Sequence, residues 1–104
     1  MMIYAHGGNG CALSAKDELP FLCKLANQNN MIFASVEFRN APETKAPGAA
    51  EDMVTVIDHL SLNGAKYNAD VNRLCIGGSN SGAHVCLSAA ILMARKGNSA
   101  YIKA

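Results

Sequence analysis

A short glycine-rich segment carries the residue types closest to nucleophilic catalysis: residues 77–82 read GGSNSG. The segment lies between an apolar run that predicts a strand and another that predicts a helix. In that setting, a Gly-x-Ser-x-Gly turn presents a serine hydroxyl for attack on an acyl carbon. If Gly78 and Gly82 are the glycines of this pattern, the tip of the turn is Asn80. A carboxamide has no ionisable proton that a histidine could remove, so the reacting atom is missing.

The same segment admits a second frame, in which Ser79 is the tip and Gly77 is the first glycine. Ser81 then stands where the crowded turn favours glycine. We therefore favour Asn80 at the nucleophile position and keep Ser79 as the alternative. Asparagine tolerates a positive φ better than most residues, so we expect the strained turn to persist without the reaction.

A second glycine-rich segment, residues 6–10 (HGGNG), follows the apolar residues 1–5. Its place after a strand and its composition are typical of a loop whose backbone N–H groups stabilise an oxyanion. Glycine clusters also mark tight turns in general, and on its own the segment indicates such a turn at least as strongly. A dinucleotide site is excluded, because Gly-x-Gly-x-x-Gly would need a glycine at Leu13.

The composition is that of one small domain. The chain has 104 residues, a formal charge of +1 and 50% apolar residues, which gives no indication of a nucleic-acid partner. No apolar run approaches the roughly 18 residues of a membrane span, and no signal-peptide pattern opens the chain, so a cytoplasmic location is expected. The cysteines at positions 11, 23, 75 and 86 lack zinc-site spacing. We expect reduced, buried thiols, no metal and no cofactor.

Strand and helix patterns alternate three times along the chain. Residues 1–5, 31–38 and 73–77 predict strands. The first helix is predicted to begin after an N-cap at Asp17, with Ser14 as the alternative because Ser14-x-x-Asp17 resembles a capping box. The other helices are predicted to cover residues 47–63 and 81–96. This alternation favours a parallel sheet with right-handed crossovers, in a three-layer α/β sandwich.

Two further expectations concern the end of the chain. Residues 81–94 contain no Asp, Glu, Lys or Arg, so we expect the last helix to be buried nearly all round. Tyr101 and Ile102 mark the start of a further predicted strand.

Four segments together resemble the hormone-sensitive-lipase-like carboxylesterases, a group of the α/β-hydrolases. The segments are residues 6–10 (HGGNG), 38–43 (FRNAPE), 45–52 (KAPGAAED) and 72–82 (NRLCIGGSNSG), in the order and spacing of that family. One such segment would be weak evidence, but four in register are specific. The resemblance implies that residues 1–104 form a partial α/β-hydrolase domain, from the oxyanion loop through the helix after the nucleophile elbow. It also implies the strand order 2-1-3 of the central part of that fold.

The resemblance assigns roles to individual residues. Gly8 and Asn9 would offer backbone N–H groups to an oxyanion, and Ser81 would offer a third from the first turn of its helix. Three such donors suit a tetrahedral acyl intermediate. Asn9 replaces a glycine of the family, and its side chain would narrow the acyl pocket. The residues expected to support the loop and the elbow are His6, Gly7, Gly78 and Gly82.

The other polar residues are assigned structural roles. The resemblance implies that Arg39 and Glu43 brace the loop after the second strand. Asp52 and Asp58 fit polar positions on an amphipathic helix. His84 is expected to be packed or to cap a backbone group, and His59 to lie near the polar side of its helix.

Two functions stay open at this point. The first is a fragment or divergent member of the carboxylic-ester hydrolases, whose complete relatives form a serine acyl-enzyme. The acid and the histidine of their triad come from loops after later strands, so we expect neither within these 104 residues, and no activity in the chain alone. The alternative is a non-catalytic ligand-binding or vestigial protein. Either would bind a small ester or another small molecule, and exposed sheet edges would favour self-association.

Overall fold

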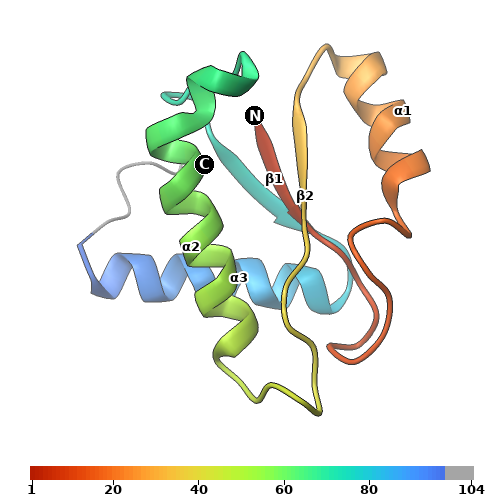
Figure 1. Cartoon of the computed structure of the whole chain (residues 1–104), viewed down its shortest axis with the longest axis vertical. Coiled ribbons are helices and arrows are strands. Elements are labelled where there is room, and N and C mark those ends of the chain that lie inside the picture. The colour runs from red at the N-terminus through yellow and green to blue at the C-terminus, as the bar shows by residue number, and fades with distance from the viewer. Residues whose placement is uncertain (98–104) are drawn as a thin grey trace.

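The computed structural model describes residues 1–97, and the strand start expected at Tyr101 and Ile102 lies outside them. Three strands alternate with three α-helices in this part of the chain (Figure 1). The elements are β1 (Met2–Ala5), α1 (Leu19–Asn29), β2 (Phe33–Val36), α2 (Gly48–Asn63), the 3₁₀ helix η1 (Gly64–Tyr67), β3 (Cys75–Gly78) and α3 (Ser81–Arg95).

β1 is the middle strand of a three-stranded sheet with the order β2-β1-β3. It runs parallel to both neighbours, with Met2 opposite Phe33 in β2 and opposite Cys75 in β3. Ile3 and Ala5 of β1 have no exposed surface, as expected for a strand that is flanked on both sides and covered on both faces. The predicted parallel sheet and its strand order are confirmed.

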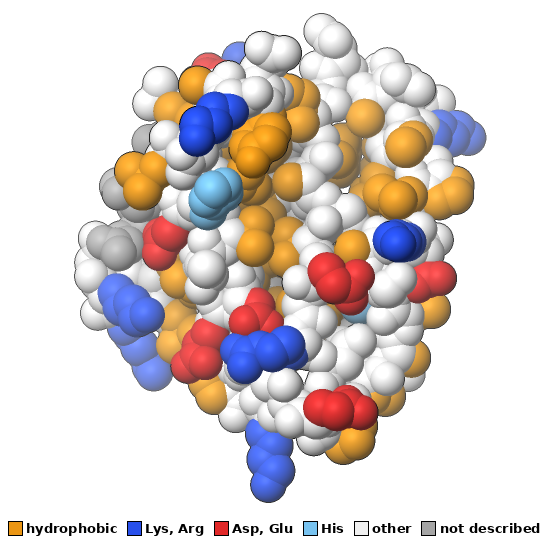
Figure 2. Space-filling model, in the orientation of Figure 1, with side chains coloured by type: hydrophobic (Ala, Val, Ile, Leu, Met, Phe, Trp, Pro, Cys, Tyr) orange, Lys and Arg blue, Asp and Glu red, His pale blue; other side chains and the backbone are white. Residues whose placement is uncertain are grey.

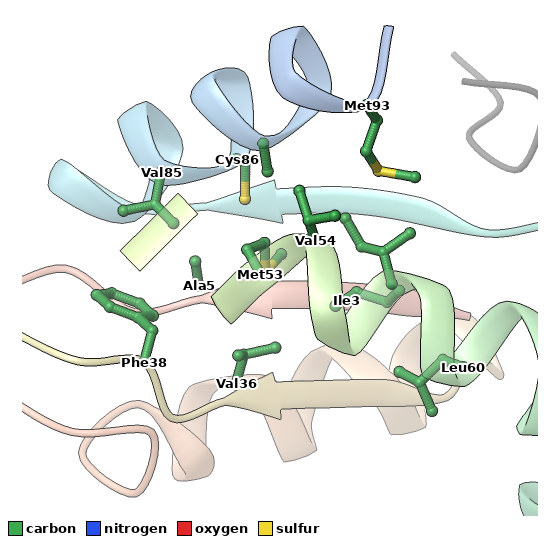
Figure 3. Packing of buried hydrophobic residues seen from close by; sticks show 12 residues of the cluster. Ile3, Ala5, Val36, Phe38, Met53, Val54, Leu60, Val85, Cys86 and Met93 are labelled. Carbon is green, nitrogen blue, oxygen red and sulfur yellow. The ribbon is translucent and has the colours of Figure 1, made fainter. Parts of the chain in front are cut away.

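The sheet is covered by α2 and α3 on one face and by α1 on the other (Figures 1 and 3). The main core lies under α2 and α3, because both helices place apolar side chains at helical spacing toward the sheet. Its buried members are Ile3, Ala5, Val36, Phe38, Met53, Val54, Ile57, Leu60, Val85, Cys86, Ala89 and Met93.

The first helix begins one residue later than expected. α1 is preceded by Glu18, and Pro20 stands in its first turn, where the missing N–H of proline costs nothing. The expected N-cap at Asp17 is therefore wrong. The Asp17 carboxylate instead accepts hydrogen bonds from the backbone N–H and the hydroxyl of Ser14, at 2.6 and 2.8 Å. These bonds lower the pKa of Asp17 and close a turn ahead of the helix.

The last helix is not buried all round, which corrects the expectation from its lack of charges. Leu87 and Ile91 on α3 are 62% and 46% exposed, because the helix buries only the side that faces the sheet and α2. His84, expected to be packed or capping, is exposed as well. No helix within residues 1–97 is long and apolar enough to cross a membrane.

The cysteines also differ from the expectation of four buried thiols. All four are free, but Cys11 and Cys23 are exposed and Cys75 is half-buried. Cys86 alone is buried, and its thiol donates a hydrogen bond to the Gly77 carbonyl at 3.1 Å. Burial raises the pKa of this thiol to about 11.

Both outer strands carry apolar surface beside them. A groove of about 570 Å³ lies between β2 and α2, and Ile32, Phe33 and Val56 are among its lining residues. Figure 2 shows hydrophobic side chains between α2 and β2, where this groove lies. A smaller hollow of about 370 Å³ lies beside β3, with Ile76 and Leu87 in its lining.

The loop after β2 is tied to α2 by one ion pair. The Arg39 guanidinium binds both carboxylate oxygens of Asp52 at 2.8 to 3.0 Å, and the Arg39 backbone N–H donates to the same group at 3.0 Å. These bonds lower the pKa of Asp52. The structural role predicted for Arg39 is confirmed. Glu43 is exposed and makes no salt bridge within residues 1–97.

Candidate active site

The two glycine-rich segments meet at one edge of the sheet. Residues 6–10 follow the carboxyl end of β1, and residues 79–82 follow the carboxyl end of β3. Because β1 and β3 are parallel neighbours, the two segments leave the sheet side by side. The structure therefore brings together the residues predicted to form the oxyanion loop and the elbow.

The turn between β3 and α3 has Asn80 at its tip. Asn80 has φ +50° and ψ −122° and directly precedes the first residue of α3. The positive φ of Asn80 is combined with a ψ far from that of the left-handed helix. Asparagine tolerates the left-handed helical region, but the conformation of Asn80 lies outside it. Such a conformation costs about 1–3 kcal/mol and persists only where the surroundings hold it.

The glycines on either side of Asn80 are required by close packing. A Cβ on Gly78 would lie 2.6 Å from the Ala5 carbonyl oxygen. A Cβ on Gly82 would collide with the same oxygen and would lie 2.5 Å from the His6 carbonyl oxygen. The strand-turn-helix unit can approach β1 this closely only with glycine at both positions, which supports the frame with Asn80 at the tip.

Two hydrogen bonds join the loop to the elbow. The backbone N–H of Asn9 donates to Oδ1 of Asn80 at 3.2 Å, and the backbone N–H of Gly10 donates to Oγ of Ser81 at 3.0 Å. Gly8, Asn9 and Gly10 all have positive φ, at 111°, 55° and 79°. A loop with three such residues needs outside contacts to keep one shape, and the elbow supplies two of them.

His6 and Gly7 hold the base of the loop. His6 is fully buried, and its ring stacks on Phe38 with centroids 4.3 Å apart. Nδ1 of His6 lies 2.7 Å from the Gly7 carbonyl oxygen, so this nitrogen carries the ring proton and donates. A Cβ on Gly7 would lie 3.0 Å from Oγ of Ser79 and 3.3 Å from Cβ of Asn80. Glycine at this position therefore lets the loop sit on the elbow.

A polar cluster beside the elbow was not predicted from the sequence. The Ser79 hydroxyl donates to Oε1 of Glu18 at 2.7 Å, while Oε2 of Glu18 is buried without a hydrogen-bond partner among the described residues. Tyr4 lies next to both, and its burial is the main cause that raises its pKa. Glu18 and Ser79 are 61 positions apart, and no local pattern marks such a pair.

Within residues 1–97, no histidine ring forms a hydrogen bond with Asn80 or Ser79. His59 and His84 are exposed on α2 and α3, and His6 is engaged with Gly7. The same residues hold no group of three or more His, Cys, Asp or Glu side chains placed to bind a metal ion.

The sequence matches the family described as the alpha/beta hydrolase fold over residues 2–104. The chain belongs to this family. In the hydrolase fold, the nucleophile elbow is a strand-turn-helix unit, and an oxyanion donor comes from the loop after another strand.

Individual relatives agree with this assignment. The chain is 35% identical to 2-hydroxyisoflavanone dehydratase of Glycyrrhiza echinata over 105 residues, which cover 88% of this chain and 32% of that protein. It is 25% identical to hormone-sensitive lipase of Mus musculus over 101 residues, covering 93% of this chain and 13% of the lipase. An esterase of Pyrobaculum calidifontis superposes with a TM-score of 0.92 at 28% identity, covering 98% of this chain and 33% of the esterase.

The chain therefore spans about a third of the plant relative and of the esterase, and less of the lipase. The resemblance drawn from the four segments, to the hormone-sensitive-lipase-like carboxylesterases, is confirmed.

Proposed function

We propose that this chain forms the acyl-oxygen-binding part of a carboxylic-ester-hydrolase-like site. The backbone N–H groups of Gly8, Asn9 and Ser81 would hold the acyl oxygen of a small ester, with Gly78 and Gly82 allowing the elbow to stand beside the loop. The observation that supports this most is the hydrogen bond from the Asn9 N–H to a carbonyl oxygen, that of the Asn80 carboxamide, at 3.2 Å. An N–H that reaches one carbonyl oxygen beside the elbow is suited to hold another.

The site as it stands would bind without cleaving. A serine at the tip would pass its proton to a base and attack the acyl carbon, and the base would return the proton to the alcohol as that group leaves. The Asn80 carboxamide cannot form that ester bond. This residue favours the second candidate function, a non-catalytic ligand-binding member of the family, over a working esterase.

A chimera tests both statements. Residues 1–97 would replace the matching third of the Pyrobaculum calidifontis esterase, so that the other two thirds come from the esterase. With Asn80 present, we expect no hydrolysis of a short-chain nitrophenyl ester above background. Asn80→Ser should restore most of the activity, and adding Ser79→Ala to it should change little.

Two outcomes would contradict the proposal. Hydrolysis by the chimera that still carries Asn80 would show that another residue is the nucleophile. A folded Asn80→Ser chimera without activity would show that the loop of residues 6–10 and the elbow do not form a hydrolase-like site.

We also propose that copies of the chain associate through the apolar surfaces beside β2 and β3. Outer strands present N–H and C=O groups that can pair with another chain, and Ile32 and Leu87 expose 37% and 62% of their surface beside them. The cytoplasmic location expected from the sequence stays a prediction, which cell fractionation would test.

A further inference from the structure

The Asn80 side chain occupies one of the donors of the proposed site. Its Oδ1 accepts the hydrogen bond of the Asn9 backbone N–H at 3.2 Å, and this N–H is one of the three assigned to the ligand oxygen. We infer that Asn80 is a built-in occupant of the site, whose carboxamide oxygen competes with the acyl oxygen of a ligand for Asn9. This inference rests on the function proposed above and adds an autoinhibitory contact to it.

The hydrogen bond between the Asn9 N–H and the Asn80 carboxamide can break without detaching the loop from the elbow. Asn80 is exposed, and its carboxamide forms no hydrogen bond within residues 1–97 other than the one from Asn9. The loop keeps a second link to the elbow when that bond breaks, because the Gly10 N–H donates to Oγ of Ser81 at 3.0 Å. Release of the carboxamide therefore frees the Asn9 donor and leaves the loop attached.

The acidic side chains of the neighbouring segments are engaged with other donors. Glu18 accepts the Ser79 hydroxyl at 2.7 Å, Glu37 accepts the Ala15 N–H at 2.8 Å, and Asp17 is bound to Ser14. The charge of Glu18, which is bound to the serine next to Asn80, also disfavours an anionic ligand. The class of ligand that best matches the occupant is a neutral acyl compound, an ester or carboxamide, with a short acyl chain.

Asn80→Gly is the direct test, because glycine removes the carboxamide and adopts φ +50° without a Cβ penalty. Asn80→Asp is the matched variant, because it keeps an acceptor oxygen at the same place. His84→Ala serves as the control, since His84 is exposed on the next turn of α3. The probe is butyramide, which is neutral and has a short acyl chain, titrated into the 104-residue chain while the backbone amide resonances are followed by NMR.

We expect butyramide to shift the amide resonances of Gly8, Asn9 and Ser81 saturably in Asn80→Gly. Its affinity should be at least about threefold higher than for the unaltered chain, the effect of one exposed hydrogen bond removed from competition. Asn80→Asp and His84→Ala should bind no more tightly than the unaltered chain. Without ligand, the Asn9 amide should lose its hydrogen-bond signature, a small temperature coefficient, in Asn80→Gly alone.

If butyramide binds the unaltered chain and folded Asn80→Gly with equal affinity, the inference is wrong, and the hydrogen bond between Asn9 and Asn80 has only a structural role. If Asn80→Gly does not fold, Asn80→Ser, which also removes the carboxamide, is judged by the same threefold criterion. The chimera separates this inference from the proposed function. If the Asn80→Ser chimera hydrolyses the ester but Asn80→Gly binds butyramide no more tightly, only the inference about Asn80 as a competing occupant is wrong. If Asn80→Gly binds butyramide more tightly but the chimera is inactive, only the hydrolase-like site is wrong.

Discussion

The Ser79 hydroxyl donates a hydrogen bond to the Glu18 carboxylate, with 2.7 Å between the two oxygens. This bond links the elbow to Glu18, the residue that precedes α1. The Ser79 hydroxyl, next to the tip of the turn, is therefore already engaged as a donor. Oγ of Ser79 also lies 3.0 Å from where a Cβ on Gly7 would be, against the base of the loop of residues 6–10. Ser79 is thus packed as part of the scaffold.

A serine-directed phosphonate probe should therefore leave Ser79 unlabelled. The reason is that its hydroxyl is engaged with Glu18 and no histidine within residues 1–97 is hydrogen-bonded to it. Peptide mass mapping of the treated chain would measure the labelling, with the Asn80→Ser chimera as the positive control. Stoichiometric labelling of Ser79 in the unaltered chain would move the nucleophile position by one residue.

Gly82→Ala should destabilise the fold by more than about 2 kcal/mol, because the new Cβ would collide with the Ala5 carbonyl. Alanine favours helices more than glycine does, so any loss comes from the collision. Urea unfolding followed by circular dichroism would measure it. The control is Gly10→Ala, which meets no atom within 4 Å but has φ +79°, and therefore tests backbone strain alone. Gly82→Ala with unchanged stability would contradict the close approach of α3 to β1.

The pair of Arg39 and Asp52 should make stability depend on pH in the acid range. The pKa of Asp52 is lowered in the fold by the hydrogen bonds from Arg39, so the folded state binds its proton less readily than the unfolded chain does. The stability from this pair is fully present above the ordinary Asp value of 3.8 and is lost as the pH falls through the lowered pKa.

Urea midpoints of the unaltered chain and Asp52→Asn, measured from about pH 7 downward, would test this. The unaltered chain should be more stable near neutral pH, and the two should converge in strong acid. Asp58→Asn is the control, since Asp58 forms no salt bridge within residues 1–97. A difference that persists unchanged into strong acid would mean that Asp52 acts through packing.

Self-association should weaken when charge is placed beside the outer strands. Ile32→Glu and Leu87→Glu would put carboxylates at the surfaces beside β2 and β3, and analytical ultracentrifugation should show a smaller fraction of dimers or larger species. Leu62→Glu is the matched control, because Leu62 is 78% exposed and lines neither surface. A monodisperse unaltered chain at high micromolar concentration would refute the association.

The thiols should differ in their rates of alkylation. Cys11 and Cys23 are exposed, whereas burial raises the pKa of Cys86 to about 11, so its thiolate is scarce at about pH 8. Iodoacetamide followed by peptide mapping should modify Cys11 and Cys23 first. All sites should react at similar rates in denaturing urea, and a native Cys86 that reacts as fast as Cys23 would contradict its burial.

The sequence by itself determined the order and type of the strands and α-helices. Apolar residues at helical spacing on α2 and the nearly continuous apolar run around β2 are local patterns, and they carry this information without any knowledge of the partner segments. Four segments in family order then specified the strand order 2-1-3 and the meeting of residues 6–10 with residues 79–82. The roles proposed for Gly8, Asn9, Asn80 and Ser81 stay predictions.

Only the tertiary structure decided what each side chain touches. The sequence wrongly suggested that α3 is surrounded and that Cys11 and Cys23 are buried, because apolar content does not say how many faces of an element have a neighbour. The bonds from Ser79 to Glu18 and from Asn9 to Asn80 join residues 61 and 71 positions apart. Such contacts depend on the crossover geometry of the whole sheet, so no local pattern records them, and they decide which polar groups of the site are already engaged.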